Sequence, residues 1–137
     1  MLLGLGATGM VLAAGTEMQA QTGSGGDETV YELRVYHLNP GKLPLILERF
    51  RTKETALFVK AGMHPIAYWT PTEGALAGDK IIYIVRHKSR EAAKESWAKF
   101  QADPEWKVVK AESEKDGAFV AQHDITFMKL TDFSPKL

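Results

Sequence analysis

The chain has 137 residues, with seventeen basic and seventeen acidic side chains and no cysteine. Its length allows one domain of about 110 residues after an N-terminal leader. The charges balance, and no segment forms a basic stripe. This argues against a protein that binds nucleic acid or that attaches to an anionic membrane through a polybasic segment. The lack of cysteine excludes disulfides, thiolate catalysis and cysteine-ligated metal sites.

Residues 1–28 are predicted to form a signal peptide and a flexible linker, which leaves residues 29–137 as the domain. Residues 1–14 are apolar and uncharged, and residues 22–26 are rich in Gly and Ser. Cleavage after Ala20 fits this layout, so we expect an exported protein, periplasmic or secreted. No Lys or Arg precedes the apolar run, and a disordered tail on a cytoplasmic protein is the alternative. The run is too short and glycine-rich for a membrane span, so an integral membrane protein is not expected.

The rest of the chain alternates between strand and helix patterns. In chain order, the predicted elements are a strand at 30–37, an amphipathic helix at 42–60, strands at 66–70 and 80–87, helical stretches after Ser89 and after Asp103, and a strand at about 122–130. Ser89 and Asp103 are the expected N-caps. This order predicts an α+β, ferredoxin-like βαββαβ fold, in which helices cover one face of an antiparallel four-stranded sheet.

Alternation divides the side chains of each strand between two faces of the sheet. We assign Leu33 and Val35 to the helix side, and Glu32, Arg34 and Tyr36 to the open side. The same reasoning gives a predicted core between sheet and helices, made of Leu33, Val35, Ile46, Leu47, Phe50, Ile82, Ile84, Trp97 and Phe100. Tyr83, Val85 and His87 then join the open face. A second copy packed on that face would enclose a partly polar cavity between the two sheets.

Several short motifs carry a family resemblance. They are Tyr31-Glu-Leu-Arg-Val-Tyr36 followed by Pro-Gly-Lys, Tyr68-Trp69 with Thr72-Glu73-Gly74, Ala102-Asp-Pro-Glu-Trp106, and Phe133-Ser-Pro135. In order and spacing, over about residues 30 to 135, they resemble the NIPSNAP family of the dimeric α/β-barrel superfamily.

The resemblance implies a ferredoxin-like protomer and a homodimer formed through the open sheet face. It leaves the reaction open, because the superfamily includes cofactor-free quinol monooxygenases, haem-degrading oxygenases, isomerases and members with no known activity. The third strand departs from the usual His-x-Trp-x-Tyr-like alternation of the family, since it carries Tyr83, Val85 and His87 instead. Any role tied to that tryptophan is therefore in doubt.

Six residues are the candidates for binding a ligand: Glu32, Arg34, Tyr36, Trp69, Tyr83 and His87. Among them, His87, Tyr36 and Tyr83 are the candidates for catalysis, with His87 as a general base. The alternatives are that Glu32 and Arg34 form a structural ion pair and that the tyrosines are interface aromatics. The histidines show no metal-ligand spacing, so no metal site is predicted, and no motif calls for a cofactor.

Two classes of function remain. The first is a homodimer that binds a small apolar or aromatic molecule in a cavity between sheet faces. The second is a cofactor-free enzyme, resembling a monooxygenase or an isomerase, that uses the same residues.

Overall fold

The computed structural model describes residues 27–137, so the predicted signal peptide and most of the linker lie outside the described residues. The elements follow the predicted order, with one unpredicted segment inside the first helix. They are β1 (Val30–Leu38), α2 (Leu43–Arg49), the π-helical segment η1 (Phe50–Glu54), α3 (Thr55–Lys60), β2 (His64–Trp69), β3 (Lys80–His87), α4 (Arg90–Ala102), α5 (Pro104–Ser113) and β4 (Val120–Met128).

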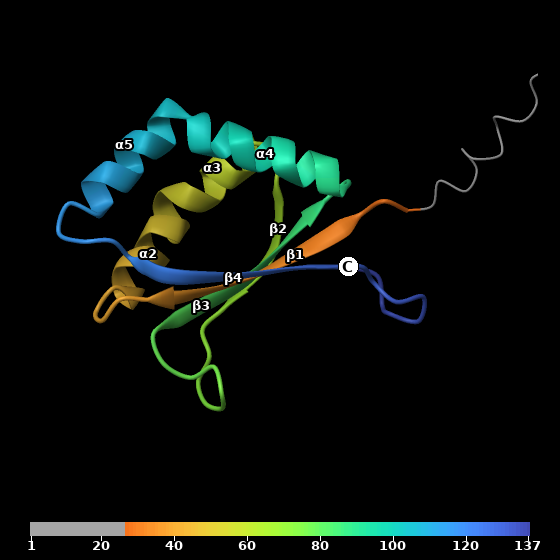
Figure 1. Cartoon of the computed structure of the whole chain (residues 1–137), viewed down its shortest axis with the longest axis horizontal. Helices are drawn as coiled ribbons and strands as arrows, with labels where there is room; N and C mark the ends of the chain where they lie inside the picture. Colours follow the sequence, from red (N-terminus) through yellow and green to blue (C-terminus); the bar gives the residue numbers. More distant parts are fainter. Residues whose placement is uncertain (1–26) are drawn as a thin grey trace, which may run out of the picture.

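The four strands form one antiparallel sheet in the order β2-β3-β1-β4, and all the helices lie on the same face of it (Figure 1). The two central strands are therefore β3 and β1, and β4 forms one edge. This is the ferredoxin-like arrangement that the sequence predicts. No helix within residues 27–137 is long and apolar enough to cross a membrane.

Local capping signals explain where the helices begin and end. The Ser89 hydroxyl accepts a hydrogen bond of 3.0 Å from the backbone N–H of Ala92, and the Asp103 carboxylate accepts one of 2.8 Å from Glu105. Each bond satisfies a backbone donor that has no partner within its helix. At the end of α3, Gly62 has a φ of +100°, a conformation that glycine adopts at little cost. The predicted N-caps are confirmed.

The first helix is not regular over its whole length. In η1 the backbone N–H of Thr55 donates to the carbonyl of Phe50, five residues earlier, which widens the helix by one residue in that turn. Arg49 and Glu54 consequently lie on the same, inward face, with only 7% and 2% of their surfaces exposed. An amphipathic helix over 42–60 with a constant period of 3.6 residues would place these two residues on the solvent side, so the regular helix expected from the sequence was wrong at this turn.

The core forms between the sheet and the helices. Ile46, Phe50 and Phe100 belong to it as predicted, and Leu47 and Trp97 pack against it. The other members of the cluster come from all parts of the fold and are Tyr36, Leu38, Leu57, Phe58, Ala61, Met63, Ile81, Tyr83, Val85, Trp106 and Phe119. Leu33, Val35, Ile82 and Ile84 are not among them. Their assignment to this core was wrong.

The two faces of the sheet are reversed relative to the prediction. The Tyr83 ring is fully buried and lies 5.5 Å from the ring of Phe50 and 5.8 Å from that of Phe58, both on the first helix. Tyr36 packs edge-on against Tyr83 from the neighbouring strand, with 5.2 Å between ring centroids. Because side chains alternate, the even-numbered residues of β1 and the odd-numbered residues of β3 face the helices. The open face instead carries the mainly apolar set that includes Leu33.

Candidate functional site

A carboxylate is buried on the helix side of β1, near the start of the strand. Glu32 has no exposed surface, yet it accepts three hydrogen bonds: from Arg34 Nε at 2.6 Å, from Trp97 Nε1 at 2.7 Å and from His87 Nε2 at 2.9 Å. The donors come from β1, α4 and β3. A buried charge is tolerated only when it is paired and hydrogen-bonded, and this one has both kinds of partner.

These donors keep Glu32 ionised. Burial alone would raise the pKa of Glu32, but the hydrogen bonds from His87 and Trp97, together with the charge of Arg34, outweigh it and lower the pKa below its ordinary value. A carboxylate can only accept hydrogen bonds, so Nε2 of His87 carries a proton. The Arg34 guanidinium also stacks on the Trp97 ring, 3.7 Å from its centroid, which fixes its orientation.

Two tyrosines continue this polar group along the sheet. Arg34 Nη1 lies 3.5 Å from the Tyr36 hydroxyl, which shares a 2.5 Å hydrogen bond with the Tyr83 hydroxyl. Burial raises the pKa of Tyr36 and raises that of Tyr83 well above its usual value. Both phenols therefore stay protonated at neutral pH. They can donate or accept hydrogen bonds, but neither supplies a phenolate.

A cavity of about 200 Å³ lies between this part of the sheet and the helices. We call it the helix-side cavity. Arg34, Tyr36, Val120 and His123 line it from the sheet. The other lining residues come from the helices and the following loop, and they are Arg49, Glu54, Trp97, Phe100, Gln101, Trp106, Lys110, Glu114 and Ala118. The wall thus combines flat aromatic surfaces with charges of both signs.

Arg49 and Glu54 form a buried ion pair that lines the cavity from the first helix. Arg49 Nε donates to Glu54 at 2.8 Å, and Arg49 Nη1 donates to the Ser113 hydroxyl at 3.1 Å and lies 3.6 Å from the Glu114 carboxylate. Burial raises the pKa of Glu54 to about 7, although the neighbouring Arg49 opposes the effect. A carboxyl group with this pKa is partly protonated at neutral pH, so it can give up or accept a proton there.

His123 faces the cavity from β4, opposite Tyr36. Its ring packs edge-on against that of Tyr36, with 4.6 Å between centroids. Partial burial lowers the pKa of His123, and the nearby charges of Arg34 and Lys110 act in the same direction. The imidazole is therefore neutral at pH 7. Within residues 27–137, no three His, Asp or Glu side chains form a group that could hold a metal ion.

The structure brings most of the predicted ligand-binding residues together, although on the other face of the sheet. Arg34 and Tyr36 line the helix-side cavity, while Glu32, Tyr83 and His87 form the hydrogen-bonded group behind them. The predicted cavity between two sheet faces cannot contain them, because they face the helices of their own protomer.

Trp69 does not belong to this group. It pairs with Ile82 at the end of edge strand β2, on the open face, and 48% of its surface is exposed. It lies on the face where the sequence predicts a cavity between two sheets, and it does not line the helix-side cavity.

The most informative wall residues were missed by sequence reasoning: Arg49, Glu54, Trp106, Lys110, Glu114 and His123. Arg49 and Glu54 are five residues apart, a spacing at which side chains share a face only in a π-helical turn. The sequence carries no reliable mark of such a turn. The nearest signal of the π-helical turn would be the basic and the acidic residue that lie five positions apart within the amphipathic helix.

Comparison with known proteins shows the family of this chain. A family model described as NIPSNAP matches residues 31–135. The chain belongs to the NIPSNAP family. The resemblance of its motifs to that family is confirmed. A search of curated proteins gives no match.

Solved structures of other NIPSNAP proteins share the fold. A NIPSNAP-like domain protein from Burkholderia xenovorans is 19% identical, with a TM-score of 0.70 over 81% of this chain and 92% of that one. A NIPSNAP family protein of unknown function from Agrobacterium tumefaciens is 23% identical, with a TM-score of 0.69 over 80% of this chain and 95% of the other.

A more distant neighbour is an enzyme. It is a variant of SnoaB, a cofactor-independent oxygenase from Streptomyces nogalater, with 10% identity and a TM-score of 0.50 over 80% of this chain and 99% of that one. At this identity the likeness shows the fold alone.

Proposed function

We propose that this NIPSNAP protein binds a compact, single-ring aromatic molecule in the helix-side cavity. The volume of about 200 Å³ lies below the range of about 300–1,000 Å³ usual for drug-sized ligands, which favours a small molecule. Tyr36, Trp97 and Trp106 supply flat apolar walls, and Arg34 and Lys110 supply cations for an acidic substituent.

The observation that carries this proposal is the buried Arg49–Glu54 pair at the cavity wall. An ion pair taken out of water adds little to stability, and often less than apolar side chains of the same size would. Titratable groups whose pKa is strongly perturbed beside a cavity are instead typical of functional sites.

Filling the cavity should test the binding proposal. Ala118 is exposed at the rim, so Ala118→Trp should occupy the space with little disturbance of the core. Ala121 is also exposed, on β4, but does not line the cavity, so Ala121→Trp is the matched control. Native mass spectrometry of protein purified from its own host should show a bound molecule in the wild type and the control but not in Ala118→Trp. A ligand retained by Ala118→Trp would refute the assignment of the cavity.

A second function, cofactor-free proton abstraction, is favoured by Glu54. A general base works best when its pKa lies near the working pH, and burial raises the pKa of Glu54 to about 7. Removal of a proton from a phenol or a carbon acid would generate an anion, which Arg34 and Lys110 could stabilise. An oxygenase or an isomerase of the cofactor-free type could begin with this step.

One measurement distinguishes ligand binding alone from proton abstraction. Once the bound molecule is identified, the exchange of its carbon-bound hydrogens for deuterium in D₂O can be followed by NMR with wild-type protein and with Glu54→Gln. An enzyme should accelerate the exchange only in the wild type, while both proteins bind the molecule. Equal exchange rates with the two proteins would leave binding as the function.

We further propose that the protein is a homodimer formed through the open face of the sheet. Leu33, Ile82 and Ile84 on this face are only partly buried in the protomer, and no helix within residues 27–137 covers them. Apolar sheet faces of this kind usually mark an interface. The proposed contact is therefore apolar, in contrast to the polar face expected from sequence. Sedimentation of wild-type protein at micromolar concentration should give the mass of a dimer.

Export remains a separate proposal, because residues 1–26 lie outside the described part of the chain. The apolar leader and the Gly-rich linker support it. Protein recovered from an envelope or secreted fraction should lack the residues before Gln21. Recovery of the intact chain from the cytoplasm would refute it.

A further inference from the structure

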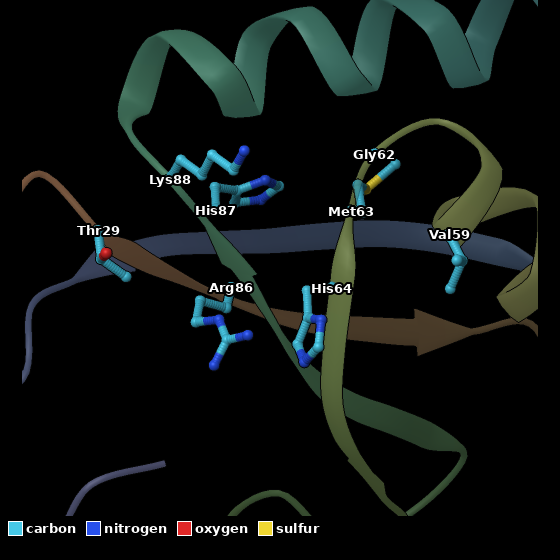
Figure 2. A pocket seen from close by; sticks show the side chains of 8 residues that line it. All are labelled: Thr29, Val59, Gly62, Met63, His64, Arg86, His87 and Lys88. Atoms are coloured by element: carbon cyan, nitrogen blue, oxygen red, sulfur yellow. The ribbon is translucent and has the colours of Figure 1, made fainter.

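A second cavity, of about 270 Å³, lies at the end of the sheet where β2 begins and β3 ends (Figure 2). We call it the strand-end pocket. Pairing between the two strands starts with His64 and Arg86. Beyond that pair β3 continues toward α4, while the chain before β2 turns into α3, and the pocket occupies the opening between them. It shares no lining residue with the helix-side cavity.

The ionisable side chains that line this pocket are all basic. His64, Arg86, His87 and Lys88 line it together with the hydroxyl-bearing Thr29, and no acidic residue does. Within residues 27–137, neither Arg86 nor Lys88 forms an ion pair with an acidic side chain. Basic groups brought together without a counter-charge attract anions.

An independent observation comes from the His87 ring, which extends from β3 into the opening (Figure 2). Its side chain is only 1% exposed, and its Nε2 atom donates to Glu32. The other ring nitrogen, Nδ1, is the one buried side-chain nitrogen or oxygen without a hydrogen-bond partner in the described part of the chain. Buried polar atoms are nearly always paired, so an unpaired one at the wall of a pocket indicates a missing partner.

We propose that the strand-end pocket binds a small oxyanion, a carboxylate or a phosphate. Lys88 would provide a charge-assisted hydrogen bond, and a protonated His87 would donate from Nδ1. Arg86, whose side chain extends to the other side of the sheet, would attract the anion by its charge (Figure 2). An imidazolium at this position would then have Glu32 on one side and the bound anion on the other, so that neither of its N–H groups is unpaired. The anion would satisfy both the uncompensated basic charge and the open hydrogen-bonding position.

The test is a titration of the full, ¹⁵N-labelled chain with inorganic phosphate and, separately, with acetate, at constant ionic strength maintained with NaCl. NMR should show saturable shifts of the His87 imidazole nitrogens and of the Lys88 and Gly62 amides. Lys88→Gln should weaken binding about tenfold, because it removes a charged donor, and Arg86→Gln should weaken it less, because it removes only a nearby charge. Lys107→Gln is the matched control, since it removes one basic charge from an exposed position on α5 that does not line the pocket.

Each outcome has a defined meaning. Tighter binding of phosphate identifies a site for a dianion, and comparable binding of both anions identifies a site for a single carboxylate; either supports the proposal. Shifts that grow linearly without saturation, or that chloride reproduces, would overturn it. An unchanged affinity in Lys88→Gln would do the same. Because these variants leave the helix-side cavity intact, the result is independent of ligand binding there.

Discussion

The Glu54 carboxyl should make the domain less stable as the pH rises through neutrality. Burial raises the pKa of Glu54 from 4.5 to about 7 in the folded protein. In the unfolded chain the carboxyl ionises near its ordinary pKa, so between the two values only the unfolded state releases the proton. Stability due to this group is therefore fully present at low pH and is lost as the pH rises. At about 1.4 kcal/mol for each pKa unit, the loss amounts to at most about 3.5 kcal/mol.

Urea denaturation between about pH 5 and pH 8 should measure this effect as a change in unfolding free energy. The wild type should lose stability with rising pH, and Glu54→Gln should lose less, by up to about 3.5 kcal/mol. The glutamine keeps a carbonyl oxygen that can accept the hydrogen bond from Arg49. Glu105→Gln is the control, because it removes one carboxyl group from an exposed position on α5 that does not line the helix-side cavity.

His123 titrates with the opposite sign. Burial lowers the pKa of His123, so its contribution to stability is present at neutral pH and is lost as the pH falls. The wild type and both variants share this contribution of His123. It therefore cancels when their curves of unfolding free energy against pH are subtracted from one another. Identical curves for the wild type and Glu54→Gln would show that Glu54 ionises near its ordinary pKa, and they would remove its role as a proton acceptor.

Three further predictions test the assignment of the sheet faces. Tyr83→Glu should abolish the cooperative thermal unfolding transition, because Tyr83 is fully buried among core rings; a folded Tyr83→Glu monomer would contradict this. Ile84→Glu should instead give a folded protein that sediments as a monomer, and Thr72→Glu in the exposed β2–β3 loop should leave the dimer intact. Ile46→Ala should cost about 2–5 kcal/mol of unfolding free energy in urea titrations. Leu33→Ala, made in the dissociated Ile84→Glu protein, should cost less than Ile46→Ala, and an equal cost would count against the open face.

Local signals in the sequence predicted the elements well. The alternation at 80–87 and the caps at Ser89 and Asp103 agree with the structure, because each depends on residues within a few positions of one another. The glycine that ends α3 is a signal of the same local kind, because a left-handed backbone conformation is needed at one position. The order of these elements was enough to predict the ferredoxin-like sheet.

The orientation of β1 could not be read from its own residues. Alternation separates Leu33 and Val35 from Glu32 and Arg34, but it does not say which set faces the helices. We expected the apolar set to be buried there. The polar set is buried instead, because donors to Glu32 arrive from His87 and Trp97, 55 and 65 positions along the chain.

The sequence by itself therefore determined the elements, their order and the two sets of side chains on each strand. The tertiary structure decided which set lies inside, and with it the place of both cavities. It also decided the burial of Arg49 and Glu54, through a single wide turn that shifts the inward face of the first helix. The physical reason is that caps and alternation act over a few residues, whereas the burial of a charge depends on partners that only the folded chain brings within hydrogen-bonding distance.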